Sequence, residues 1–167
     1  MYLQTKRLEI KPICQESLES LTDLLTNDVV KQTYMVPDFA CRADAYPLAQ
    51  RIQALSEDPQ RYVAGVYLGQ QLIGMVNDTD RDGDCIELGY AFLPQYHNHG
   101  YCTEMLVCVT EYLLNNGFRQ VLTGAFSGNA ASLRVMEKSG MTRIDRTDDI
   151  EYRGQTHRCI YYLAQKD

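Results

Sequence analysis

Eight residues near the middle of the chain, 97–104, have the types and spacing of an anion-binding turn. They read His-Asn-His-Gly-Tyr-Cys-Thr-Glu and follow a strand-like run at 86–93. From Cys102 onward, apolar residues recur at helical spacing. The first amides of a helix have no partner inside it and carry the positive end of its dipole, so a tight turn into a helix presents N–H groups to an anion. The sequence therefore predicts that this loop can cradle a pyrophosphate.

A glycine between a strand and a helix also occurs for purely structural reasons, so this loop alone does not define a ligand site. A second unit of strand, turn and short helix supports the phosphate interpretation. It begins at Asn129, contains Ser132 and ends with Gly140 as a C-terminal cap. Two such units in this order are much harder to obtain by chance than one.

Together the two motifs resemble the GNAT superfamily of acyl-CoA-dependent N-acyltransferases, most closely the branch with the Rim-type N-terminal acetyltransferases of ribosomal proteins. The family's phosphate motif, Gln/Arg-x-x-Gly-x-Gly/Ala, falls on residues 97–102. Gly100 matches it, whereas His97 replaces the usual Gln or Arg and Cys102 replaces the small residue. Further matches are Tyr101, Thr103, Glu104, Asn129, Ser132, Lys138, Gly140, the opening strand at 5–12 and the late hairpin at 152–157.

The elements that must position these motifs follow from hydrophobic periodicity and from Gly and Pro breakers. Strands are expected at 7–13, 61–68, 71–77, 85–93, 120–126, 142–149 and 157–163, with 80–84 linking the third to the fourth. Helices are expected at 18–27, 47–58, 102–116 and after Asn129. The fold class is α+β. The resemblance implies a GNAT fold: a mixed, mostly antiparallel sheet of six to seven strands with about four flanking helices. It also implies that strands 85–93 and 120–126 splay apart and admit the pantetheine arm of CoA.

Acyl transfer to an amine requires a neutral amine, donors for the developing oxyanion and a proton for the leaving thiolate. Glu87 is the candidate base, because it lies in a strand beside the expected cofactor gap, where partial burial raises proton affinity. Alternation places it on the face of Gly89 and Ala91. The alternative is an outward-facing, solvated carboxylate. Backbone amides at 88–92 are the candidate oxyanion donors, and the Tyr90 hydroxyl is a further candidate.

Many relatives in this superfamily use a tyrosine to protonate the leaving thiolate, but Met136 stands at the corresponding position here. The resemblance implies that Ser132 replaces it, because in the Rim-type branch the serine of Asn-x-x-Ser lies near the cofactor sulfur, although a capping role is equally open. Asn129 is expected to bind pantetheine, to cap the helix, or to do both. His97 and His99 are expected to contact cofactor or solvent rather than to act as acid and base. The predicted cofactor-binding residues are Leu88, Tyr90, Ala91, Phe92, His97, Asn98, His99, Gly100, Tyr101, Cys102, Thr103, Asn129 and Ser132.

Length, net charge and the distribution of apolar residues indicate the number of domains, the kind of partner and the location of the protein. A length of 167 residues suits one domain spanning 1–167, and a formal charge of −6 disfavours nucleic acid and favours a cationic acceptor. The aspartates at 78, 80, 82 and 84 either attract an amine or form a solvated turn. The start of the chain has no signal-peptide pattern, and no run is long and apolar enough to span a membrane, so a cytoplasmic protein is expected.

The six cysteines show no metal-ligand spacing, so no metal is expected and the thiols are expected to be reduced. Cys102 is either a buried packing residue or, as a thiol at a helix N-terminus, a reactive one.

The sequence therefore predicts an acetyl-CoA-dependent N-acetyltransferase that moves an acetyl group directly to a primary amine in a ternary complex. The acceptor is a protein N-terminus or a small-molecule amine, and the enzyme is a monomer or homodimer. Two alternatives remain: a CoA-binding module of the same fold that has lost efficient catalysis, and a nucleotide-binding regulator. The second is disfavoured because the chain lacks the G-x-x-x-x-G-K-S/T and dinucleotide-binding fingerprints.

Overall fold

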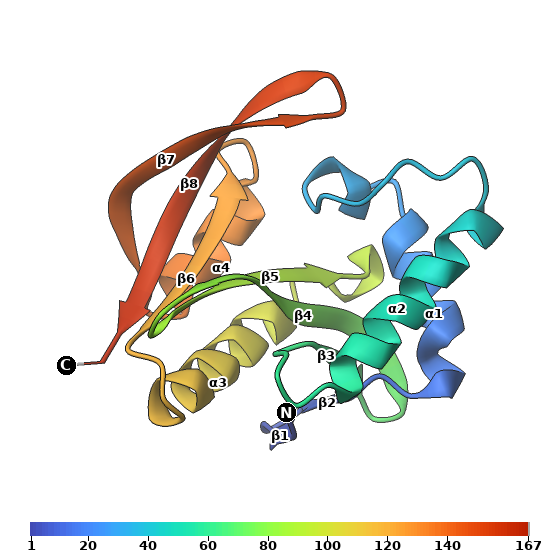
Figure 1. Ribbon diagram of the computed structural model, residues 1–167, viewed down its shortest axis with the longest axis horizontal. Coiled ribbons are helices and arrows are strands. Elements are labelled where there is room, and N and C mark those ends of the chain that lie inside the picture. The colour runs from blue at the N-terminus through green and yellow to red at the C-terminus, as the bar shows by residue number, and fades with distance from the viewer. Residues whose placement is uncertain (167) are drawn as a thin grey trace. The chain divides into compact units, whose positions relative to one another are not determined.

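The computed structural model describes residues 1–166, which form two compact units (Figure 1). Unit 1 contains residues 1–78 and 90–101, and unit 2 contains residues 79–89 and the described chain from 102 onward. The described residues include eight strands and four α-helices, and hydrogen bonding orders the strands β1-β2-β3-β4-β5-β6-β8-β7. This confirms the α+β fold class, with one strand more than the six to seven expected. The prediction of a single domain stays a prediction.

Unit 1 carries the first part of the sheet and the first two α-helices. Its strands pair antiparallel, β1 with β2, β2 with β3 and β3 with β4. The elements that begin in unit 1 are β1 (Leu3–Gln4), β2 (Glu9–Lys11), α1 (Leu18–Thr26), α2 (Tyr46–Glu57), β3 (Ala64–Leu68) and β4 (Gln71–Asp82), with 3-10 turns η1 (Gln15–Ser17), η2 (Val30–Gln32), η3 (Arg42–Ala45) and η4 (Pro94–Tyr96).

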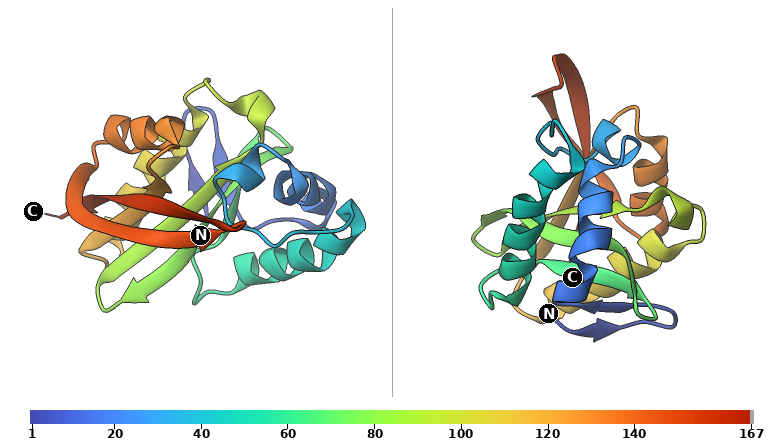
Figure 2. Two further views of the ribbon diagram at one scale, coloured as in Figure 1. Left: turned by 90° about the horizontal axis from the view of Figure 1, so that it is seen from above. Right: turned by 90° about the vertical axis from the view of Figure 1, so that its right-hand side faces the viewer.

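The core of unit 1 lies between α1, α2 and one sheet face. Both helices lie next to each other along the sheet in Figure 2. Leucines at 18, 21, 24 and 25 form the apolar stripe of α1 and are 0–1% exposed. They share a cluster with Tyr67, Leu72 and Met75 from the strands and Ala49 from α2. This packing holds β3 and β4 in place within the unit.

Unit 2 carries the remaining strands and both motif helices, α3 and α4, apart from residues 90–92 of β5 and the first residue of α3, which belong to unit 1. After β5 (Cys85–Phe92), the chain forms α3 (Tyr101–Asn115), β6 (Gln120–Phe126), α4 (Ala130–Lys138), β7 (Thr142–Tyr152) and β8 (Gln155–Gln165). Strand β6 pairs antiparallel with β8 along its whole length, and β8 pairs with β7, so the three run side by side in Figure 1. Helix α3 ends before Gly117, whose φ of 109° suits a residue without a side chain.

Parallel pairing between β5 and β6 is short. It joins Cys85–Leu88 to Gln120–Thr123, whereas β5 continues to Phe92 and β6 to Phe126. Within unit 2, β5 and β6 thus share hydrogen bonds over the first part of each strand. The beginnings of the two strands are therefore fixed together. The splay of their later parts stays a prediction.

Most predicted elements are confirmed, and the strand at 120–126 has the predicted bounds. Two expectations are wrong in detail. The strand predicted at 7–13 is only β2, because the Thr5 hydroxyl accepts from the Leu8 amide at 2.9 Å and turns the chain just before it. The link predicted at 80–84 contains only residues 83 and 84, because β4 extends to Asp82 and Gly83, at φ 58°, supplies the tight turn.

Candidate active site

The predicted phosphate loop turns through two residues in the left-handed region of backbone space. Asn98 has a φ of 63° and Gly100 a φ of 78°. Asparagine tolerates this conformation better than most residues and glycine adopts it freely. The short helix η4 leads into the turn and α3 begins directly after it, at Tyr101. The order of strand, turn and helix is therefore as predicted.

Three side chains donate hydrogen bonds to backbone carbonyl groups in and next to this loop. The His97 ring donates from Nε2 to the Phe92 carbonyl at 2.9 Å, and the His99 ring donates from Nδ1 to the His97 carbonyl at 2.7 Å. Arg7 donates from Nη1 to the His99 carbonyl at 2.9 Å. Both histidines therefore hold the loop itself, a role that sequence reasoning missed because a ring-to-carbonyl contact has no sequence pattern.

The amides of the same loop have no acceptor among the described residues 1–166. Within residues 1–166, no backbone N–H from Asn98 to Thr103 donates a hydrogen bond outside the helices and strands, and these residues include the first turn of α3. Successive N–H groups in a turn with left-handed residues form a concavity that binds anions, and the N-terminus of a 15-residue helix adds its dipole. The geometry therefore suits a phosphate or pyrophosphate group.

Cys102 lies at the start of α3, and its pKa is raised rather than lowered there. Burial raises its pKa strongly, which overrides the stabilisation that a helix N-terminus offers to a thiolate. Burial is also the main cause of raised thiol pKa values at Cys85, Cys108 and Cys159. Of the two readings for Cys102, the structure supports packing rather than reactivity.

The second motif places Asn129 and Ser132 in a reciprocal contact at the start of α4. The Ser132 amide donates to the Asn129 Oδ1 at 3.2 Å, and the Asn129 Nδ2 donates to the Ser132 Oγ at 3.0 Å. Asn129 is thus the N-cap residue. The Ser132 hydroxyl is used as an acceptor, so it retains its own proton for donation.

Glu87 lies on β5 with its side chain 21% exposed. The Arg146 guanidinium approaches its carboxylate at 3.5 Å, and the Thr79 hydroxyl donates to the other oxygen at 3.3 Å. Arg146 also donates to Asp148 at 3.0 Å and lies over the Tyr161 ring, 4.0 Å from its centroid. Glu87 is thus held in a polar cluster and is not a freely solvated carboxylate.

An irregularity in β7 positions Arg146. Between the pairs Arg143↔Tyr162 and Thr147↔Ile160, β7 advances four residues while β8 advances two. Extra residues of this kind bend a strand and redirect its side chains. Sequence reasoning missed Arg146, because it is 59 positions from Glu87 and a bulge leaves little trace in the hydrophobic pattern.

A hollow of about 430 Å³ lies beside Glu87 in unit 2. Its apolar part is formed by Leu122, Ile144 and Leu163, and its polar part includes Glu87 and Arg146. Three further lining residues, Asp80, Arg81 and Asp82, come from the end of β4. Of the predicted acidic cluster, Asp80 and Asp82 thus border this hollow.

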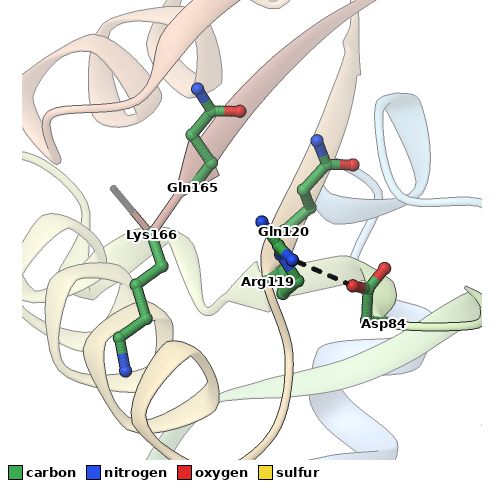
Figure 3. A pocket seen from close by; sticks show the side chains of 5 residues that line it. All are labelled: Asp84, Arg119, Gln120, Gln165 and Lys166. Atoms are coloured by element: carbon green, nitrogen blue, oxygen red, sulfur yellow. Dashed lines mark ion pairs between the residues drawn. The ribbon is translucent and has the colours of Figure 1, made fainter.

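The other two aspartates of that cluster are engaged in ion pairs. Asp78 is buried and pairs with Arg61 at 3.0 Å in unit 1. Asp84 pairs with Arg119 at 3.7 Å in unit 2. Figure 3 shows this second pair in a polar hollow of about 290 Å³ with Gln120, Gln165 and Lys166. That hollow lies where β6 begins, whereas the Asn129 turn follows the end of β6.

The remaining predicted residues lie at the end of β5. Leu88, Ala91 and Phe92 are buried, and the hydroxyl of Tyr90 is buried as well. Residue 74 on β4 must be glycine-sized, because a Cβ there would be 2.6 Å from the Ala91 carbonyl oxygen. The proposed contacts of these β5 residues with cofactor stay predictions.

Among the residues that the structure describes, no group of His, Cys, Asp and Glu is arranged to hold a metal ion, and no helix is long and apolar enough to span a membrane.

Comparisons with known proteins identify the family and the fold. The family model described as "Acetyltransferase (GNAT) domain" matches residues 7–142. No curated protein matches the chain. A GNAT-family acetyltransferase from Bacillus anthracis has a similar fold, with a TM-score of 0.84 and 21% identity over 99% of this chain and 98% of that one.

Two further structures have the same coverage, 99% of this chain and 98% of theirs. They are a putative ribosomal-protein-serine acetyltransferase from Vibrio cholerae, at 19% identity and a TM-score of 0.78, and the RimL acetyltransferase of ribosomal L7/L12 in complex with coenzyme A, at 15% identity and a TM-score of 0.84. At these identities the likeness shows the fold, whereas the family model covers most of the chain itself. The chain therefore belongs to the GNAT acetyltransferase family.

Proposed function

We propose that this protein is an acetyl-CoA-dependent N-acetyltransferase that transfers the acetyl group directly to a primary amine. The observation that carries the proposal is the set of six backbone amides, 98–103, without an acceptor in the described protein. They would hold the pyrophosphate of CoA. Acetyl-CoA supplies a thioester whose carbonyl carbon accepts the amine nitrogen. Asn129 and Ser132 would face the pantetheine arm and the leaving sulfur, and the amides at 88–92 would stabilise the oxyanion.

Direct transfer is favoured over a covalent acetyl-enzyme. A thiol nucleophile works as a thiolate, and burial raises the pKa of Cys85, which lines the hollow beside Glu87. Glu87 would instead accept the amine proton, directly or through one water. The hollow combines apolar side chains with three carboxylates and two guanidinium groups, so acidic groups are in the majority and it suits a primary amine next to an apolar group. A protein N-terminus is the first acceptor to test, in line with the fold's likeness to acetyltransferases of ribosomal proteins.

The test is a screen of N-terminal peptides and small amines for acetylation by mass spectrometry, with titration calorimetry for acetyl-CoA. The Gly100→Val variant should lose acetyl-CoA affinity by at least about tenfold, because a β-branched residue strains a φ of 78° and distorts the amide cradle. Gly117→Val is the matched control: it strains a φ of 109° at the end of α3, so stability falls and affinity does not.

Retained affinity in a folded Gly100→Val variant would refute the cradle. Acetyl-CoA binding without acetylation of any amine would indicate instead a CoA-binding module of the same fold.

A further inference from the structure

Arg7 lies at the tip of a turn that the chain holds firmly. The strands on either side pair as Leu3↔Ile10 and Gln4↔Glu9. Between them, the Thr5 amide donates to the Leu8 carbonyl at 2.9 Å, and the Leu8 amide donates to the Thr5 hydroxyl at 2.9 Å. Leu8 is 1% exposed. With the residue after it anchored in the core, the Arg7 backbone has little freedom to move.

From this turn Arg7 reaches the phosphate loop, 92 positions away in sequence and in the same compact unit. Besides its hydrogen bond to the His99 carbonyl, its guanidinium lies over the Tyr101 ring, 4.5 Å from the centroid. The Tyr101 ring in turn stacks on the His99 ring at 5.5 Å and 11°. Arg7 therefore contacts the residues on both sides of Gly100.

The His99 carbonyl and the Gly100 N–H belong to one peptide unit. Because a trans peptide is planar and its C=O and N–H point in opposite directions, fixing the carbonyl also fixes the direction of the amide. The His99 ring fixes the preceding Asn98 N–H in the same way, through the His97 carbonyl. Arg7 supplies the corresponding bond for Gly100, and it comes from outside the loop.

We propose that Arg7 is a positioning residue of the phosphate loop: it fixes the peptide between His99 and Gly100 so that the Gly100 amide faces the bound anion. The inference rests on the proposed function, since the anion is the pyrophosphate of CoA. A preorganised donor binds without the entropic cost of ordering the loop first. Loss of Arg7 therefore weakens cofactor binding and leaves the acetyl-transfer step intact.

The experiment compares Arg7→Ala with Lys6→Ala, which removes the neighbouring exposed cation of the same turn. In the ligand-free protein, the NMR order parameter of the Gly100 N–H should fall from about 0.85 to below about 0.6 in Arg7→Ala and stay near the wild-type value in Lys6→Ala. In steady-state assays, Arg7→Ala should raise the KM for acetyl-CoA by about three- to tenfold. Its kcat and its KM for the amine should stay within about twofold.

Arg7→Lys is the conservative variant. It keeps a cation and a donor but not the planar group over Tyr101. The order parameter of the Gly100 N–H and the KM for acetyl-CoA should therefore lie between the values of the wild type and of Arg7→Ala. The inference is overturned if Arg7→Ala matches Lys6→Ala in either readout. Wild-type protein that does not bind acetyl-CoA would refute the proposed function alone. In that case the order parameter still decides whether Arg7 holds the loop.

Discussion

At the scale of single residues, the candidate site relies on side chains that hold other groups as much as on groups that would react. Backbone carbonyls in and next to the loop accept hydrogen bonds from the side chains of His97, His99 and Arg7. Arg146 bridges the Glu87 and Asp148 carboxylates. The groups proposed to react are thus few, and each can be tested separately from the residues that position it.

Ser132→Ala separates the proposed chemical role from helix capping. If the hydroxyl serves the leaving thiolate, kcat should fall by about tenfold to a hundredfold with little change in the KM for acetyl-CoA. Stability should change little, because the cap bond runs from the Ser132 amide to Asn129, and this bond remains. Asn129→Ala removes the cap and should cost about 1 kcal/mol in urea unfolding. Wild-type turnover by Ser132→Ala would exclude the chemical role.

Glu87→Gln tests the proposed base. The amide keeps the shape of the side chain and cannot accept the amine proton, so kcat should fall by about tenfold or more. Glu111→Gln removes an exposed carboxylate on α3 and should leave kcat within about twofold. Initial rates at saturating acetyl-CoA and amine make the comparison. If the two variants have equal rates, proton removal belongs to another group, and Tyr90 is then the first to test.

At the scale of elements, the close contact between β6 and β8 depends on a missing side chain. A Cβ at Gly124 would be 2.7 Å from the Tyr161 ring and 2.8 Å from the Cys159 Sγ. Tyr161 is 4% exposed and packs beneath the Arg146 guanidinium, so its ring has little room to move. Gly124 therefore sets the spacing of the two strands in this part of unit 2.

Gly124→Ala should lower the free energy of unfolding by about 1–3 kcal/mol, because it overpacks this contact. Gly128→Ala is the control, since nothing lies within 4 Å of a Cβ there and its stability should change by less than about 0.5 kcal/mol. Urea titrations of both variants provide the measurement. Equal midpoints would mean that the strands adjust to the added methyl group without cost.

The success of sequence reasoning also differed between elements for physical reasons. The strand at 120–126 was predicted to the residue, because glycines bracket an apolar run on both sides. The open amides at 98–103 followed from the local order of strand, turn and helix. Arg7 and Arg146 were missed, because each acts on a partner 92 or 59 positions away and only the folded chain brings them together.

At the scale of the whole molecule, buried tyrosines make stability sensitive to alkaline pH. Burial raises the pKa of Tyr34 from 10.0 to about 12, and its hydroxyl donates to Asn77 Oδ1 at 2.7 Å. Burial also raises the pKa of Tyr67 and of Tyr161. Because the unfolded chain releases these protons first, stability is fully present below pH of about 10 and is lost as the pH rises toward about 12.

Tyr34→Phe should therefore reduce the loss of stability between pH 9 and pH 11. These two pH values lie about one unit below and above the ordinary tyrosine pKa of about 10. At pH 7 the variant should be less stable by about 1 kcal/mol, because the bond to Asn77 is gone. Tyr2→Phe, at a tyrosine that is 74% exposed, is the control and should leave the pH dependence unchanged. A Tyr34→Phe slope equal to that of the wild type would contradict the prediction.

The interleaving of the two units along the chain affects how the protein is made. A ribosome releases the chain from its N-terminus, and unit 1 lacks its last segment, 90–101, until unit 2 has already begun with residues 79–89. That late segment brings Ala91 and Leu93 into the core built around α1 and α2. Because Ala91 and Leu93 belong to its core, unit 1 can complete this core only after residues 79–89 of unit 2 have also been synthesised.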